Sequence, residues 1–182
     1  MTRTSIKRDK ANIVLIGFMG CGKTTAGKAA AQLLGMGFLD IDAEIERAES
    51  MAIPDIFRER GEAYFREAES RRLRSLAGSG IKSAVIATGG GVVKNPENMR
   101  LLREIGLIVY LSAAPEKLLA NIGKAGQRGR PLLDVPDPEG ELWRLHKERD
   151  PLYRSFCDAV VDCDSLDVNG TAQKIVEIAR GD

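Results

Sequence analysis

The stretch GFMGCGKT, residues 17–24, decides the fold. Its spacing fits G-x-x-x-x-G-K-[ST], a loop in which glycines let successive backbone N–H groups turn toward one phosphate-sized cavity. In such a loop Lys23 would reach the β- and γ-phosphates, and the hydroxyl of Thr24 would hold Mg²⁺. The motif therefore predicts a binding site for a nucleoside triphosphate.

The flanking residues give this loop the expected context. Ile13–Ile16 is a short apolar run, which is typical of a buried parallel strand. From Lys23 to Leu34 apolar residues recur at helical spacing, so we expect a packed helix whose positive N-terminal end faces the phosphates. The residues expected to bind ATP in this loop are Gly20, Cys21, Gly22, Lys23, Thr24 and Thr25.

Strand and helix patterns alternate along the rest of the chain. Further strands are predicted near residues 38–40, 85–88, 107–111 and 159–161. Residues 43–77 are charged and helix-forming, with interruptions at Pro54 and Gly61. Asn95, Pro115 and Asp137 mark helix starts. The pattern predicts a single α/β domain built on a five-stranded parallel sheet flanked by helices, and the Gly-, Pro- and charge-rich segment 123–137 is expected to form a mobile lid.

Composition excludes several classes of partner. The chain has 182 residues, and 27 Lys plus Arg against 26 Asp plus Glu leave a net charge of +1. So balanced a charge argues against nucleic acid or anionic membrane as the main partner. No apolar run approaches the roughly 18–20 residues of a membrane span. The basic residues 1–10 are expected to be a disordered arm, and the odd count of 3 cysteines favours a cytoplasmic protein with free thiols.

Among the classes of phosphate-loop protein, the sequence favours a small-molecule kinase over a GTPase or a motor ATPase. A GTPase would need a guanine-reading N-K-x-D, which the chain lacks, and its one D-x-x-G, Asp137–Gly140, lies in a proline-rich loop. The run of apolar residues ending in Asp162 lies too near the C-terminus for the central strand of a motor ATPase. A kinase needs an acceptor pocket, a carboxylate near Mg²⁺ and a lid that excludes water.

Five blocks in order resemble the shikimate kinase family. They are GFMGCGKTT, FLDIDAEIE, IPDIFRERGEAYFRE, GGGVV and the pair RPLL and DPLYR, and they extend from residue 17 to residue 154. The resemblance implies one kinase domain over residues 11–182, a monomer, with substrate-binding helices at about 43–77. It also implies transfer of the ATP γ-phosphate to the 3-hydroxyl of shikimate, giving shikimate 3-phosphate and ADP on the route to chorismate and the aromatic amino acids.

The resemblance also assigns roles around the transferred phosphate. Lys23, Asp42 and Arg130 are the implied catalytic residues. Asp42 would bind substrate hydroxyls and accept the proton of the attacking one, while Asp40 would organise Mg²⁺ through water beside Thr24. Without the family, a D-x-D at the end of a strand is more often a helix cap. Asp40 and Asp42 are expected to close the second strand, where a spacing of two residues would make them face the same side.

The acceptor pocket is implied by a second group of residues. The shikimate carboxylate calls for arginine forks, and Arg66 and Arg154 match the family's carboxylate ligands. Gly89, Gly90 and Gly91 would bring bare backbone against the substrate ring. Arg130 in RPLL would reach the transferring phosphate when the lid closes. The two arginines Arg58 and Arg60 are expected on the solvated face.

Two alternatives stay open, and one residue departs from the family. The family's adenine-stacking arginine falls at Gly123, seven residues before Arg130, which puts the adenine contact in doubt. A kinase for another polyol acid such as gluconate would lack the arginine pair. A non-catalytic regulatory module would bind ATP without turnover.

Overall fold

The computed structural model describes residues 12–125 and 131–181. Its centre is a five-stranded parallel sheet in the order β2-β3-β1-β4-β5. This confirms the predicted fold class. The expected basic arm at 1–10 and the expected lid residue Arg130 lie outside the described residues. The strands are β1 Ile13–Ile16, β2 Gly37–Asp40, β3 Ala84–Ala87, β4 Leu107–Ser112 and β5 Ala159–Asp162.

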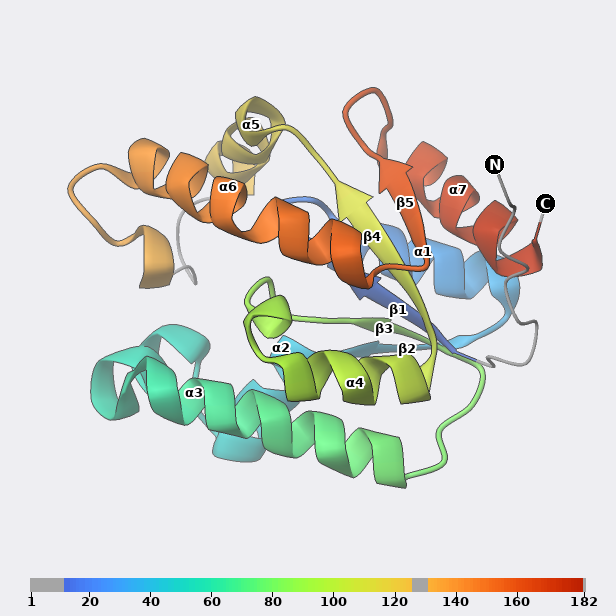
Figure 1. Cartoon of the computed structure of the whole chain (residues 1–182), viewed down its shortest axis with the longest axis horizontal. Helices are drawn as coiled ribbons and strands as arrows, with labels where there is room; N and C mark the ends of the chain where they lie inside the picture. The colour runs from blue at the N-terminus through green and yellow to red at the C-terminus, as the bar shows by residue number, and fades with distance from the viewer. Residues whose placement is uncertain (1–11, 126–130, 182) are drawn as a thin grey trace.

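Helices cover both faces of this sheet (Figure 1). α1 and α7 pack against each other on one face, and α4 and α6 lie on the other. Each crossover is thus consistent with the right-handed connection that parallel strands require. The helices are α1 Lys23–Leu34, α2 Ile41–Glu49, α3 Ile53–Gly78, α4 Pro96–Ile105, α5 Pro115–Ala125, α6 Pro138–Phe156 and α7 Val168–Arg180, with short 3₁₀ turns η1 Val92–Lys94 and η2 Pro131–Leu133.

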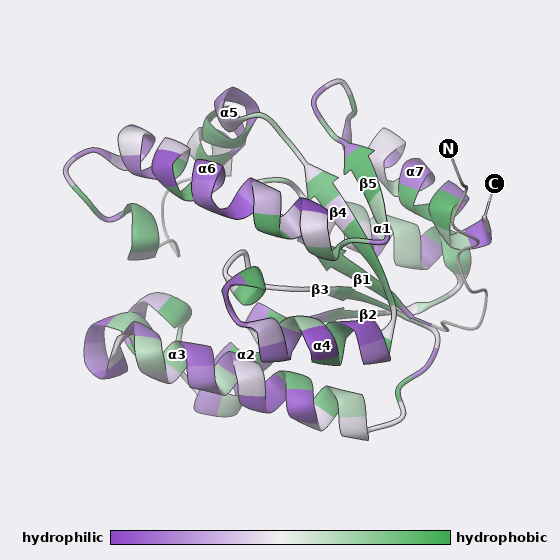
Figure 2. Ribbon diagram, in the orientation of Figure 1, coloured by the Kyte–Doolittle hydropathy of each residue, from purple (hydrophilic) through white to green (hydrophobic). Residues whose placement is uncertain are grey.

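The core lies on the three central strands. Every residue of β1 and β3 is buried, as are the first five of β4, because helices cover both faces. Val14 pairs with Ile86 of β3 on one side and with Ile108 of β4 on the other. Figure 2 shows the strands as mainly hydrophobic, with hydrophilic residues on the outer sides of α3, α4 and α6. Among the described residues, no helix is long and apolar enough to cross a membrane.

The predicted helix starts are confirmed. The side chain of Asn95 accepts a hydrogen bond from the N–H of Glu97, and that of Asp137 accepts one from the N–H of Gly140. The helical region 43–77 forms three pieces, since α2 ends before Pro54 and Gly61 kinks α3 with φ 83°. The expected lid segment is partly helical, because α5 continues to residue 125 and η2 begins at 131.

Chain direction places the functional site. From β1 the chain crosses to β2 on one side, whereas β4 lies on the other side of β1. The connections therefore diverge at the carboxyl end of β1, and ligands of open α/β sheets bind in the crevice formed there.

Candidate active site

The phosphate loop joins β1 to α1. Gly20 and Gly22 have φ of 83° and 91°, a region that side-chain-bearing residues rarely adopt, so glycine is required for this turn. Lys23 is buried, and its ammonium donates to the carbonyl oxygens of Gly17 at 2.8 Å and Phe18 at 2.9 Å. The loop thus holds a positive charge at the N-terminus of α1.

A pocket of about 400 Å³ opens in front of this loop. Cys21 is buried, and its Sγ lies within 4 Å of the position that a Cβ on Gly17 would occupy. Cys21 is not among the described residues that line this pocket. The other predicted ATP-binding residues of the loop do line it. The lining residues are Met19, Gly20, Gly22, Lys23, Thr24, Thr25, Asp40, Asp42, Thr88, Gly90 and Asn121.

Asp40 has two roles at the mouth of this pocket. One carboxylate oxygen accepts from the N–H groups of Asp42 and Ala43, so Asp40 caps α2. The other accepts the hydroxyl of Thr24 at 2.7 Å. The strand ends at Asp40 and Asp42 belongs to the first turn of α2, so the expectation that both aspartates lie in one strand was wrong.

A second, smaller pocket of about 90 Å³ adjoins the first. The two share Met19, Asp42 and Gly90 in their walls. The smaller pocket combines apolar side chains with charged groups and bare backbone. Its lining residues are Met19, Asp42, Ile53, Phe57, Phe65, Arg66, Gly89, Gly90, Gly91, Pro131, Leu132 and Arg149.

Arg66 enters this pocket from α3. Its guanidinium donates to Glu62 at 3.1 Å and to the fully buried Glu69 at 3.2 Å. A Cβ added to Gly91 would lie 2.4 Å from the Arg66 guanidinium, so a side chain at this position would displace the guanidinium from its present place. Burial raises the pKa of Glu69, and the positive charges of Arg66 and Arg149 oppose that rise.

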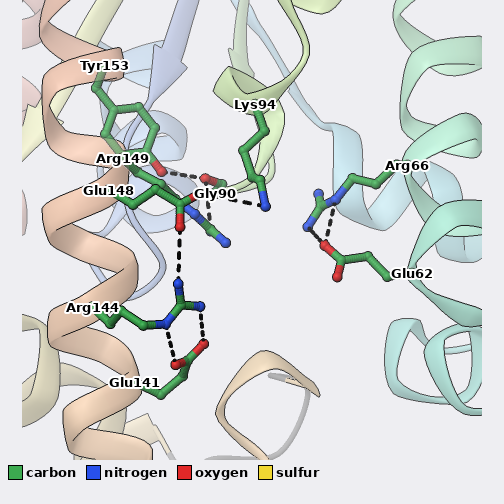
Figure 3. A network of polar contacts seen from close by, with 9 residues as sticks. All are labelled: Glu62, Arg66, Gly90, Lys94, Glu141, Arg144, Glu148, Arg149 and Tyr153. Atoms are coloured by element: carbon green, nitrogen blue, oxygen red, sulfur yellow. Dashed lines mark hydrogen bonds and ion pairs between the residues drawn. The ribbon is translucent and has the colours of Figure 1, made fainter.

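Arg149 enters from α6. Its side chain is 1% exposed, and it donates to the carbonyl oxygen of Gly90 at 3.4 Å. The hydroxyl of Tyr153 donates to the same oxygen. Figure 3 shows Arg149 reaching Gly90 from α6 and Arg66 pointing toward the same region from α3. The described structure thus brings two guanidinium groups to one small pocket.

Arg154 lies elsewhere, which corrects the sequence-based assignment. It is 52% exposed and pairs with Asp150 at 2.8 Å and with the hydroxyl of Ser112 at 3.1 Å. Neither described pocket has Arg154 in its wall. A separation of five residues turns the helix by about 140° beyond a full turn, so Arg149 and Arg154 project from different faces of α6.

Asp42 stands where the two pockets meet. Burial raises its pKa to about 7, and the negative charges of Glu69 and Asp40 contribute to the rise. Its Oδ1 is buried and accepts no hydrogen bond from any described residue. An oxygen in this state can take a proton from a hydroxyl group bound beside it.

Comparison with known proteins agrees with this geometry. The family model for shikimate kinase matches residues 19–180. A shikimate kinase of Thermoanaerobacter pseudethanolicus is 43% identical over 166 residues, which are 91% of this chain and 94% of that protein. The chain belongs to the shikimate kinase family.

Solved structures extend the likeness to three dimensions. A shikimate kinase from Acinetobacter baumannii in complex with shikimate superposes with a TM-score of 0.88 at 40% identity, over 96% of this chain and 95% of that one. A gluconokinase from Sinorhizobium meliloti superposes with a TM-score of 0.59 at 16% identity, over 96% of this chain and 94% of that one. That second likeness shows a shared fold alone.

Sequence reasoning missed three polar residues of this shikimate kinase. Glu69 follows Arg66 by three residues, a spacing that places two side chains on one helical face. Arg149 immediately precedes Asp150, the first residue of the DPLYR block, and was not among the predicted site residues. Asn121 lines the phosphate pocket and donates to the carbonyl oxygen of Gly20 at 3.0 Å, whereas Gly123 is exposed and outside the described lining.

Proposed function

We propose that this shikimate kinase transfers the γ-phosphate of ATP to the 3-hydroxyl of shikimate, giving shikimate 3-phosphate and ADP. The observation that carries the proposal is the common wall of the two pockets, formed by Met19, Asp42 and Gly90. A phosphate held by the loop and an acceptor held in the smaller pocket would meet at that wall. Such positioning supplies most of the rate in phosphoryl transfer.

The acceptor carboxylate would bind between Arg66 and Arg149. Two guanidinium groups in one small pocket favour a carboxylate, because each can donate two parallel hydrogen bonds to it. The apolar side chains Ile53, Phe57 and Phe65 would pack on the carbon ring. Bare backbone at Gly89, Gly90 and Gly91 leaves room for the ring to approach.

Asp42 would orient the attacking hydroxyl and accept its proton. Its position at the shared wall places it near both the acceptor and the phosphate. Lys23 would neutralise charge on the β- and γ-phosphates once ATP replaces the carbonyl contacts of its ammonium. Arg130 is proposed, on the family resemblance, as the lid residue that reaches the transferring phosphate.

Thr24 and Asp40 fit a Mg²⁺ site. A hydroxyl and a carboxylate oxygen lie 2.7 Å apart at the phosphate pocket, and Mg²⁺ prefers such oxygen ligands together with waters and phosphates. Thr24 would hold the ion directly and Asp40 through water. Bound there with ATP, the ion would neutralise the charge that develops on the phosphates.

We further propose that the enzyme is a cytoplasmic monomer. The described Cys21, Cys157 and Cys163 are free thiols, which is consistent with a reducing compartment. Light scattering would test the monomer, with an expected mass of 19.8 kDa.

Release of ADP from Mg-ATP tests the reaction itself. Shikimate, gluconate, a nucleoside monophosphate and no acceptor are compared side by side at equal concentration. We expect rapid ADP release with shikimate alone. Turnover with gluconate instead would show that Arg66 and Arg149 bind the carboxylate of another acid. ATP binding without any turnover would favour a regulatory module.

A further inference from the structure

Four side chains outside both pockets join α2 to α3. Glu49, the last residue of α2, accepts hydrogen bonds from Arg60 at 2.6 Å, from the Tyr64 hydroxyl at 2.7 Å and from Arg71 at 3.1 Å. The Tyr64 ring also lies near both guanidinium groups, 4.8 Å from Arg60 and 5.6 Å from Arg71. We call Glu49, Arg60, Tyr64 and Arg71 the helix clamp.

The helix clamp spans the kink of α3. Gly61 has φ 83° and ψ 166°, so it interrupts the helix between Arg60 and Tyr64. Arg60 ends the first segment, while Tyr64 and Arg71 belong to the second. Because Glu49 binds side chains of both segments, its carboxylate fixes the angle between them.

Both segments contribute to the acceptor pocket. Ile53 and Phe57 line it from the first segment, and Phe65 and Arg66 line it from the second. Phe57 and Phe65 also contact each other across the kink, with ring centroids 5.1 Å apart. A change in the angle at Gly61 would therefore move the apolar wall relative to the Arg66 guanidinium.

Charge and burial distinguish the helix clamp from ordinary surface pairs. The Glu49 side chain is only 14% exposed although it lies outside the core, and the Tyr64 hydrogen bond and the two arginines lower its pKa. Arg58 offers the contrast, because it is 67% exposed and pairs with Asp55 and Glu59 inside the first segment alone. An exposed pair within one segment cannot set an angle between two.

We propose that the helix clamp is a positioning device for shikimate binding, with Glu49 as its central residue. This inference rests on the proposed acceptor pocket and goes beyond it, since none of the four residues lines either described pocket. The clamp holds the two segments of α3 at the angle that lets Phe57 and Arg66 contact one acceptor molecule together. Most of the phosphate pocket lies on the loop after β1 and on α1, and α2 contributes Asp42 from its first turn, at the opposite end of the helix from Glu49. ATP binding should therefore depend far less on the clamp than shikimate binding does.

Steady-state kinetics of Glu49→Gln test the proposal, with Arg58→Gln in the first segment of α3 as the control. For Glu49→Gln we expect the shikimate KM to rise about three- to tenfold, while kcat and the ATP KM stay within about twofold. Tyr64→Phe keeps the ring between the arginines and the Glu49 contacts with Arg60 and Arg71, but loses the hydroxyl that donates to Glu49 and accepts from Arg60, so a smaller rise in the same KM is expected. Arg58→Gln should change none of the three constants.

The shikimate KM of the Glu49→Gln, Tyr64→Phe double variant provides the second readout. Because Glu49 and Tyr64 act through one contact, the double variant should raise the shikimate KM by less than the product of the two single effects. An unchanged shikimate KM in both single variants would overturn the proposal, as would an equal loss in both KM values and kcat. If Glu49→Gln fails to fold, Tyr64→Phe decides alone. Failure of the wild type to use shikimate would instead overturn the proposed function.

Discussion

At the scale of single residues, the chemistry depends on the carboxyl groups of Asp42 and Glu69, which both lie close to Gly89. A Cβ on Gly89 would lie 2.8 Å from Oδ1 of Asp42 and 2.7 Å from Oε1 of Glu69. Two acids whose oxygens approach the same point beside Gly89 favour the neutral form of at least one of them. The guanidinium of Arg66 contacts Glu69 directly, which leaves Asp42 as the acid with the less compensated charge.

The raised pKa of Asp42 predicts a pH dependence. Below pH 7 the carboxyl group is protonated and cannot accept the substrate proton, so kcat/KM should rise as the pH increases through about 7. Asp42→Asn should lower kcat by about 10²- to 10⁴-fold and remove this limb of the profile. ATP binding by the variant should stay nearly unchanged. Unimpaired turnover of Asp42→Asn would exclude Asp42 from the proton transfer.

Arginine assignments show what residue-level motifs can and cannot predict. Arg66 lies in the wall of the smaller pocket, and its role as a carboxylate ligand stays a prediction. Arg154 lies outside both pockets. The residues DPLYR alone carry no information on which face of α6 meets the sheet, so the sequence could not predict this position. Tyr153 and Arg149 settle that face by donating to the Gly90 carbonyl, a contact 63 residues away in sequence for Tyr153.

At the scale of elements, α3 combines two pocket walls in one helix by means of its kink. Gly61 has no heavy atom within 4 Å of the position a Cβ would occupy, so its requirement for glycine comes from φ alone. The sequence predicted an interruption there. It could not predict the angle, which depends on contacts with α2.

Replacement of Gly61 measures this requirement. Gly61→Ala should lower the free energy of unfolding by about 1 kcal/mol, because a side chain disfavours positive φ. Gly78→Ala is the matched control, since Gly78 ends the same helix, is exposed and has open space around it. Denaturant unfolding of both variants checks the difference. Equal stability of Gly61→Ala and the wild type would show that the kink tolerates a second conformation.

α6 illustrates how one helix serves two purposes. On one face Arg149 and Tyr153 contact Gly90, at the acceptor pocket. On another face Asp150 accepts the Tyr110 hydroxyl at 2.7 Å and pairs with Arg154. The second group of contacts fixes α6 against β4 and thereby places Arg149. Arg154 is thus part of the support of the site and not of its wall.

At the scale of the whole molecule, the fold was predictable because its signals are local. Each central strand is a short apolar run, and the glycine loop after the first one fixes a parallel α/β arrangement. Strand order and the meeting of α3 with α6 across Gly90 come from tertiary packing, which no single motif records. The missed residues Glu69 and Arg149 belong to that second category.

The central claim is that Arg66 and Arg149 bind the carboxylate of the acceptor in the smaller pocket. That pocket meets the phosphate pocket at Asp42. The shikimate KM of Arg149→Lys, measured beside that of Arg154→Lys, tests it most directly. Loss of a planar guanidinium fork should raise the KM of Arg149→Lys by about 10- to 100-fold. Arg154→Lys should stay within about twofold of the wild type. A large rise for Arg154→Lys together with an unchanged KM for Arg149→Lys would contradict the account.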